Sequence, residues 1–388
     1  MSLLPESLEM SEEVSKWRRH LHEHPEILYD VHKTAAFVAE KLRTFGCDEV
    51  ATGIGRTGVV GFIHGRAGPG GPTVGLRADM DALPITETTG ATWASKTPGK
   101  MHACGHDGHT AMLLGAARHL TATRNFSGSV AVIFQPAEEG GAGGLAMVKD
   151  GMMERFGINR IFGMHNLPGL AVGQFATRPG PITASTDEFS ITITGKGGHA
   201  AMPHQAADPI VASAAIVSAL QSIASRNVDP LQSIVVSVTK FNGGFAHNVI
   251  PETVKLAGTV RSLTPQNRDL AETRLKEIAS GVATAYNTIA EIRYTRSYPV
   301  SINHETETTM AADSAAMLAG EENVDRATAP MMGGEDFAYM LEARPGSFIF
   351  IGNGDTAGLH HPAYDFNDKV IPWGISYWVK IAENALSN

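Results

Sequence analysis

The sequence of 388 residues is poor in cysteine, with only Cys47 and Cys104. Two thiols cannot form a disulfide framework, and so few in a chain of this length suit a reducing compartment. No apolar run approaches the roughly 18 residues that predict a transmembrane helix, and no basic segment followed by an apolar run marks a secretory signal. The net charge of −9 is mild and spread out, which favours neither nucleic acid binding nor an acidic tail. We therefore expect a soluble cytoplasmic protein.

The length of the chain favours two domains rather than one. In residues 1–184 and 297–388, buried strand patterns alternate with helix patterns, which predicts an α/β domain with a mostly parallel sheet and helices on both faces. Residues 185–296 instead predict the order β-α-β-β-α-β, the split βαβ unit of ferredoxin-like domains. We expect this second domain to be inserted in the first.

The densest group of chemically active side chains lies in Met101–Thr110, which holds three histidines, a cysteine and an aspartate ahead of a helix pattern. Thiolate sulfur and imidazole nitrogen are preferred ligands of zinc and neighbouring first-row metals. A core cysteine beside surface histidines is the alternative, but packing does not explain Cys-x-His with histidines on both flanks. The segment predicts a metal site.

Other polar side chains follow predicted strands, at the end where ligands bind in open α/β sheets. Asp79 and Asp81 follow one strand, and both would point to the same face if the strand continued. Glu138 and Glu139 follow a second strand; solvated turns are the alternative for all four carboxylates. The candidate metal ligands are Cys104, His106, Glu139, His165 and His360. Five donors exceed the four of a structural zinc site, which favours two metals sharing one donor.

Four motifs together resemble the M20 family of metallopeptidases and amidohydrolases. They are Met101–Asp107, Gln135–Glu139, Gly333–Phe337 and Leu359–Pro362. The resemblance covers nearly the whole chain in order, including the inserted lid domain. It is strongest to the hippurate hydrolases, N-acyl-amino-acid amidohydrolases and plant indole-acetyl-amino-acid hydrolases.

The resemblance implies two divalent metal ions (Mn²⁺, Zn²⁺, Co²⁺ or Ni²⁺), with Cys104 bridging them where the wider family has an aspartate. His106, Glu139, His165 and His360 would complete the ligand set, with His361 as an alternative register for the last. Glu138 would be the general base toward a metal-activated water. Asp81 matches the carboxylate that orients the site. The family has His-x-Asp where this chain has Asp79-Met80-Asp81, which leaves the role of Asp79 open.

The inserted domain carries its own polar residues, and in the family that this chain resembles the positions of His199, Asn248 and Arg261 contact substrate. An arginine suits a substrate carboxylate because its planar guanidinium pairs with both oxygens. We expect the three side chains to gather at one edge of the domain. A structural or solvated histidine is the alternative for His199. A homo-oligomer through this domain is also expected.

The sequence therefore predicts a metal-dependent amidohydrolase of small N-acyl amino acids, with no nucleic acid or membrane partner. Two other functions stay open. One is a thiol hydrolase using Cys104 with His106 or His109 as base. The other is a non-catalytic module that binds metal or peptide. No residue indicates which acyl group or amino acid is preferred.

Overall fold

The computed structural model describes residues 3–387 and divides the chain into two compact units. Unit 1 comprises Met1–Ile182, Ile302–Ala329 and Asp336–Asn388, and unit 2 comprises Thr183–Ser301 and Pro330–Glu335. The predicted inserted domain of residues 185–296 differs from unit 2 by short segments at its ends and by the loop 330–335. Two short strands, β7 (Gly180–Thr183) and β14 (Ser301–Asn303), lie where the chain passes from one unit to the other.

Unit 1 is built on an eight-stranded sheet with the order β1-β2-β4-β3-β5-β16-β6-β15. The strands are β1 (Glu49–Ile54), β2 (Gly58–His64), β3 (Thr73–Asp79), β4 (Ser129–Gln135), β5 (Ile158–Pro168), β6 (Phe175–Ala176), β15 (Val324–Asp325) and β16 (Gly346–Gly354). The four central strands β4, β3, β5 and β16 are parallel, while β1, β2 and β6 pair antiparallel with their neighbours toward the centre. The predicted mostly parallel sheet is thus the central part of a mixed sheet.

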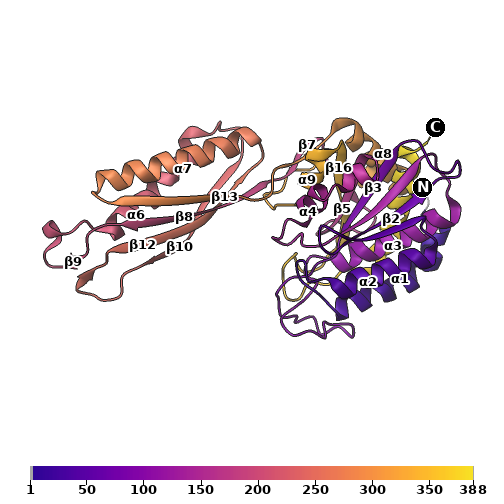
Figure 1. The fold of residues 1–388 in the computed structure, drawn as a ribbon, viewed down its shortest axis with the longest axis horizontal. Coiled ribbons are helices and arrows are strands. Elements are labelled where there is room, and N and C mark those ends of the chain that lie inside the picture. The colour runs from indigo at the N-terminus through magenta and orange to yellow at the C-terminus, as the bar shows by residue number, and fades with distance from the viewer. Residues whose placement is uncertain (1–2, 388) are drawn as a thin grey trace. The chain divides into compact units, whose positions relative to one another are not determined.

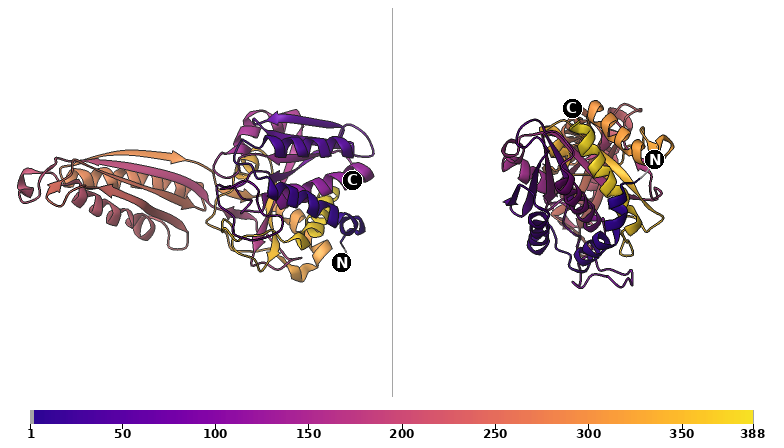
Figure 2. Two further views of the ribbon diagram at one scale, coloured as in Figure 1. Left: turned by 90° about the horizontal axis from the view of Figure 1, so that it is seen from below. Right: turned by 90° about the vertical axis from the view of Figure 1, so that its right-hand side faces the viewer.

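Helices cover both faces of this sheet (Figures 1 and 2). On one face lie α1 (Pro5–Glu23), α2 (His32–Phe45), α3 (His106–Thr123), α8 (Glu305–Ala319) and α10 (Ile371–Ala385); on the other lie α4 (Gly143–Lys149), α5 (Met152–Arg155) and α9 (Ala338–Ala343). Alternate residues of β4 enter the two cores, Val132 on the first face and Ile133 on the second. Both faces of the strand are therefore buried, which explains its nearly continuous apolar sequence.

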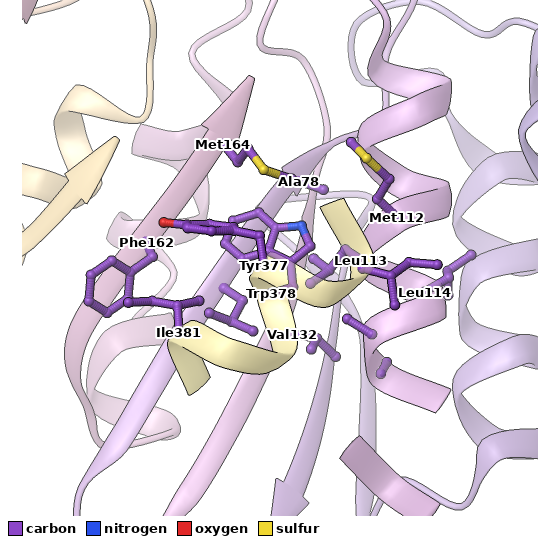
Figure 3. Packing of buried hydrophobic residues seen from close by; sticks show 14 of the residues in the cluster. Ala78, Met112, Leu113, Leu114, Val132, Phe162, Met164, Tyr377, Trp378 and Ile381 are labelled. Carbon is purple, nitrogen blue, oxygen red and sulfur yellow. The ribbon is translucent and has the colours of Figure 1, made fainter. Parts of the chain in front are cut away.

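The larger core lies between the sheet and helices α3 and α10 (Figure 3). Trp378 and Tyr377 of α10 pack there with Leu113 of α3 and with Val132 and Phe162 of the sheet. Because β3, β4, β5 and β16 are parallel, their carboxyl ends meet at one edge above this core. The loops that follow these ends carry the polar side chains singled out in the sequence.

Unit 2 contains a four-stranded antiparallel sheet with two helices on one face, in the chain order β-α-β-β-α-β that was predicted. Its elements are β8 (Ser185–Thr194), α6 (Pro209–Leu220), β10 (Ile234–Gly243), β12 (Thr253–Ser262), α7 (Pro265–Ala285) and β13 (Ile289–Arg296), with a small ladder of β9 (Gly198–His199) and β11 (Val249–Ile250). Strands β10 and β13 form the two edges of the sheet.

The stretch Pro209–Asn227, which includes α6, is the one described helical segment that is long and apolar enough to cross a membrane by length and composition alone. One face of α6 buries Ala212, Ile216 and Leu220 in the core of unit 2. This burial is typical of a core helix in a globular domain.

Candidate metal centre

Cys104 and His106 are placed by the turn that begins α3. Gly105 between them has a positive φ of 92°, a conformation that glycine adopts without strain. A β-carbon at this position would lie 2.2 Å from the side-chain nitrogen of Asn166. Gly105 therefore allows the turn before α3 to pack closely against Asn166 of β5, and the side chains of Cys104 and His106 are both buried.

The five predicted ligands form two overlapping groups that share one sulfur. In Cys104–His106–His165 and in Cys104–Glu139–His360, one potential ligand atom of each residue lies within 4.8 Å of those of the other two. The Cys104 sulfur is 3.4 Å from Nε2 of His165, and Nε2 of His360 is 3.3 Å from a Glu139 oxygen. Cys104 is thus the one predicted ligand that belongs to both of these groups.

Both buried histidines of this cluster are oriented by backbone carbonyl groups. His106 Nδ1 is 2.8 Å from the carbonyl oxygen of Asp81, and His165 Nδ1 is 2.7 Å from that of Asn166. With Nδ1 donating, Nε2 of each ring carries the lone pair that a metal needs. Among the described residues, Nε2 of His106 has no hydrogen-bond partner although it is fully buried. An orphaned nitrogen beside sulfur and carboxylate donors fits first-row divalent ions.

Asp81 holds the loop that carries the two glutamates. One of its carboxylate oxygens accepts a hydrogen bond from the backbone N–H of Glu138 (2.9 Å) and the other from that of Glu139 (3.1 Å). The same residue also presents its carbonyl oxygen to His106. Asp81 therefore fixes three neighbouring residues of the cluster at once.

Asp79 lies 3.7 Å from Nε2 of the predicted ligand His106, and its hydrogen bonds go to other residues. Its carboxylate accepts a hydrogen bond from Arg77 at 2.7 Å and pairs with His109 Nδ1 at 2.6 Å. Arg77 also donates to Asp336, whose backbone N–H lies 3.4 Å from a Glu138 oxygen. Asp79 is thus a buried anion within a hydrogen-bonded network beneath the cluster.

Arg77, Asn166 and Asp336 also belong to the surroundings of the cluster, although the sequence did not predict a role for them there. All three are fully buried. For Arg77 a signal existed, because a cation within an otherwise apolar buried strand must have anionic partners. For Asn166 the only local signal was its position next to His165.

Burial and the surrounding charges set the protonation of the cluster. Burial raises the pKa of the Cys104 thiol well above its usual range, and Glu139 and Glu138 add to the effect. Burial alone lowers the pKa of His106, but Asp79 and Asp81 outweigh it and raise this pKa to about 10. This surplus of buried negative charge is the electrostatic environment that favours a bound cation.

The structure distinguishes the two adjacent histidines of the 359–362 loop. Both are exposed, but Nε2 of His360 lies 3.3 Å from a Glu139 oxygen, whereas Nδ1 of His361 accepts a hydrogen bond from the backbone N–H of Ala363 at 3.0 Å. The structure therefore brings His360, and not His361, to the cluster.

The three predicted substrate contacts of unit 2 do not gather at one edge, so that expectation is wrong. His199 and Asn248 are neighbours at the β9–β11 ladder, which follows the Thr194 end of β8, while Arg261 lies opposite Thr186 at the other end. At about 3.4 Å per residue, Thr186 and Thr194 of β8 are roughly 27 Å apart. The separation arises because β8 and β12 run antiparallel, which places the end of β12 beside the start of β8.

Arg261 itself lies on the face of the unit 2 sheet that has no helix. This half-buried side chain lines a cavity of about 570 Å³ together with Glu188, Lys240 and Arg293. Within the described part of the chain, its guanidinium makes no hydrogen bond. Its donors therefore remain available to an anionic group.

A cluster of sulfur, imidazole and carboxylate donors at the carboxyl edge of a parallel sheet, beside a further buried glutamate, defines a metal-dependent hydrolase. The family model of peptidase family M20/M25/M40 matches residues 75–384. The chain belongs to this family, which confirms the resemblance and the assignment as a hydrolase. The α/β class is confirmed by the central parallel strands with helices on both faces.

Named relatives agree with this assignment. The chain is 42% identical over 382 residues to a hippurate hydrolase of Campylobacter jejuni, covering 98% of this chain and 99% of that one. It is 42% identical over 355 residues to an N-acetyl-L-cysteine deacetylase of Bacillus subtilis, covering 91% and 83% of the two chains. The solved structure of YXEP from Bacillus subtilis, a dinuclear metal-binding peptidase of the M20 family, has a TM-score of 0.85 and 36% identity, covering 98% of this chain and 99% of that one.

Proposed function

We propose that this chain is a two-metal amidohydrolase that cleaves the amide bond of small N-acyl amino acids. The observation that carries the proposal is the position of Glu138, a buried carboxylate next to a five-donor cluster whose central sulfur belongs to both groups of donors. A hippurate hydrolase and an N-acetyl-L-cysteine deacetylase act on N-acyl amino acids by their names, and they support this substrate class.

Cys104 would bridge two divalent ions, of Mn²⁺, Zn²⁺, Co²⁺ or Ni²⁺. His106, Glu139, His165 and His360 would complete the ligand set. The softness of the sulfur and imidazole donors and the orphaned Nε2 of His106 support this assignment.

The reaction needs a nucleophile, stabilisation of the developing negative charge and a proton for the leaving nitrogen. The bound ions would lower the pKa of a water molecule and offset charge on the amide oxygen. Glu138 would accept the proton of the attacking water and deliver it to the leaving nitrogen. Asp81 would orient Glu138 by accepting a hydrogen bond from its backbone N–H.

Substrate recognition is assigned to unit 2. Arg261 would pair with the free carboxylate of the amino acid, which its open hydrogen-bond donors and its place in a polar cavity support. His199 and Asn248 would contact substrate as a separate pair, since they adjoin each other and not Arg261.

The thiol-hydrolase alternative is disfavoured by the surroundings of Cys104. A nucleophilic cysteine needs a lowered pKa, whereas burial and nearby carboxylates raise the pKa of this thiol. His109, one of its two proposed bases, is already occupied, because Nδ1 pairs with Asp79 and Nε2 accepts from the backbone N–H of Asn166. His106, the other, donates through Nδ1 to the Asp81 carbonyl, and Asp79 and Asp81 raise its pKa to about 10, which disfavours it as a base near neutral pH.

A substrate panel tests the proposed function. The metal-loaded protein would be assayed with N-acetyl, N-benzoyl and indole-acetyl derivatives of several amino acids, and release of the free amino acid would be measured. Hydrolysis of at least one series supports the proposal. Turnover of simple esters or peptides with no N-acyl amino acid cleaved would contradict it.

We also propose that the chain self-associates through unit 2. Helix α6 contains no charged residue and leaves Ile210 and Val211 exposed, and the segment at and after the end of edge strand β10 exposes Phe241 and Phe245. A second copy related by a twofold axis would meet this uncharged surface without like-charge repulsion. Sedimentation of the wild type and of Val211→Glu tests the idea: a wild-type monomer, or an unchanged oligomer in the variant, contradicts it.

A further inference from the structure

Asn166 lies among the segments of unit 1 that carry the predicted metal ligands, but it has no role in the proposed reaction. It lies in β5 directly after His165 and is fully buried. An asparagine side chain offers two donors and one acceptor group, and all three are engaged here.

Each of these hydrogen bonds reaches a different segment of the site. The Asn166 amide donates to the carbonyl oxygen of Cys104 at 2.7 Å and to Nε2 of His109 at 2.9 Å. Its oxygen accepts a hydrogen bond from the Tyr364 hydroxyl at 2.8 Å. Tyr364 belongs to the loop that carries His360, so one amide connects Cys104, helix α3 and that loop.

The backbone around the amide leaves little room for it to move. A β-carbon on Gly105 would lie 2.2 Å from the Asn166 nitrogen and 2.5 Å from the Tyr364 oxygen. Because Gly105 has no side chain, the Asn166 amide can pack against the backbone between Cys104 and His106.

We infer that Asn166 is a positioning residue that sets the separation of the two metal positions. By fixing the Cys104 carbonyl and the Tyr364 hydroxyl to one rigid amide, it holds the shared sulfur at a set distance from the loop of His360. Metal sites depend on such outer hydrogen bonds, whose loss typically weakens metal affinity about 10- to 100-fold. The inference rests on the two-metal site proposed above.

The test is a titration of the metal-free protein with Mn²⁺, with bound ions counted by the EPR signal of free Mn²⁺. The spin coupling between bound ions reports their separation. For Asn166→Ala we expect the affinity for the weaker-bound ion to fall about 10- to 100-fold, with loss of the coupled signal at two equivalents. Wild-type affinities and coupling in this variant would overturn the inference.

Asn303 provides a matched control elsewhere in unit 1. It is equally buried, and its amide donates to the carbonyl oxygens of Phe348 and Arg178 while accepting from the backbone N–H of Phe348. None of these partners belongs to a ligand-bearing loop. Asn303→Ala should therefore lower the melting temperature as Asn166→Ala does but leave Mn²⁺ binding unchanged. A matching loss of Mn²⁺ affinity in both variants would show that Asn166 acts only through general stability.

Tyr364→Phe keeps the amide and removes one of its hydrogen bonds. We expect the affinity for the weaker-bound Mn²⁺ to fall in this variant too, but by less than in Asn166→Ala. If Asn166→Ala does not fold, Tyr364→Phe provides the test instead. Unchanged Mn²⁺ binding in Tyr364→Phe would then overturn the inference. The wild-type titration separates this idea from the proposed function. A wild type that binds fewer than two ions contradicts the two-metal site, whereas two ions bound with the same affinities in wild type and variant contradict only the role of Asn166.

Discussion

Replacing Glu138 by glutamine removes a base while preserving the shape of the site. Glu138 is buried, its backbone N–H is held by Asp81 at 2.9 Å, and its side-chain oxygen lies 3.4 Å from the backbone N–H of Asp336. Glutamine retains the length of the side chain and an oxygen for that N–H. It cannot accept the proton of the attacking water, which is the one property that the proposed mechanism requires.

The expected loss follows from that role. General base catalysis contributes about 10²- to 10⁴-fold, so kcat should fall by at least about 10²-fold, equivalent to about 2.7 kcal/mol of activation free energy. Metal content should stay at the wild-type level. The assay combines steady-state hydrolysis of an N-acyl amino acid with metal analysis of the purified protein.

The neighbouring Glu139 supplies the matched comparison. Its backbone N–H binds the same Asp81 carboxylate, but its side chain faces Cys104 and His360. Glu139→Gln should therefore lose metal, and activity with it. Near-normal turnover in Glu138→Gln, or loss of metal from that variant, would refute the assignment of Glu138 as the base.

Three further predictions follow from other residues of the two units. Cys104→Ser should lower metal occupancy, and in the wild type bound metal should protect Cys104 from alkylation; free alkylation of the metal-loaded protein would contradict a bridging sulfur. Asp81→Asn replaces a carboxylate oxygen with an N–H₂ group facing a backbone N–H, so kcat and metal affinity should both fall. Loss of a charge-assisted hydrogen bond of roughly 1.5–3 kcal/mol corresponds to about 10- to 100-fold in each. A variant with normal kcat and normal metal affinity would contradict the positioning role of Asp81. Arg261→Ala should lower kcat/KM about 10- to 100-fold on an N-acyl amino acid but little on the matching amide; equal losses on both substrates would show a role in folding instead.

Local patterns in the sequence predicted the main elements of the fold. The buried strands and helices of unit 1 have apolar sequences bounded by glycine or proline, and Gly46 ends α2 in the left-handed conformation that glycine favours. Two elements were missed for physical reasons. Strand β1 is an exposed edge strand with little apolar alternation, and α4 begins with two glycines, which have low helix propensity. The Gly144 N–H in α4 is bound by Asp336, which lies far away in the chain.

In the site, too, local sequence patterns predicted some residues but not those that depend on distant contacts. That Cys104, His106 and Glu139 come together was predictable, because metal-binding residue types are close in sequence or follow a buried strand. The roles of Asp79 and Asn166 were not, because they depend on contacts with residues that are distant in the chain. Asn166 binds a carbonyl oxygen 62 residues away. Such pairings follow from the folded sheet and not from any local pattern.

Removal and restoration of metal tests the central claim most directly. The protein would be stripped with a chelator and titrated with Mn²⁺, Zn²⁺ or Co²⁺, and bound ions per chain and hydrolysis of an N-acyl amino acid would be followed together. A two-metal amidohydrolase loses activity on stripping and regains it as occupancy approaches two ions per chain. Full activity in the stripped protein would contradict the account and favour the thiol hydrolase, and binding of two ions without any hydrolysis across the substrate panel would favour a non-catalytic metal-binding module.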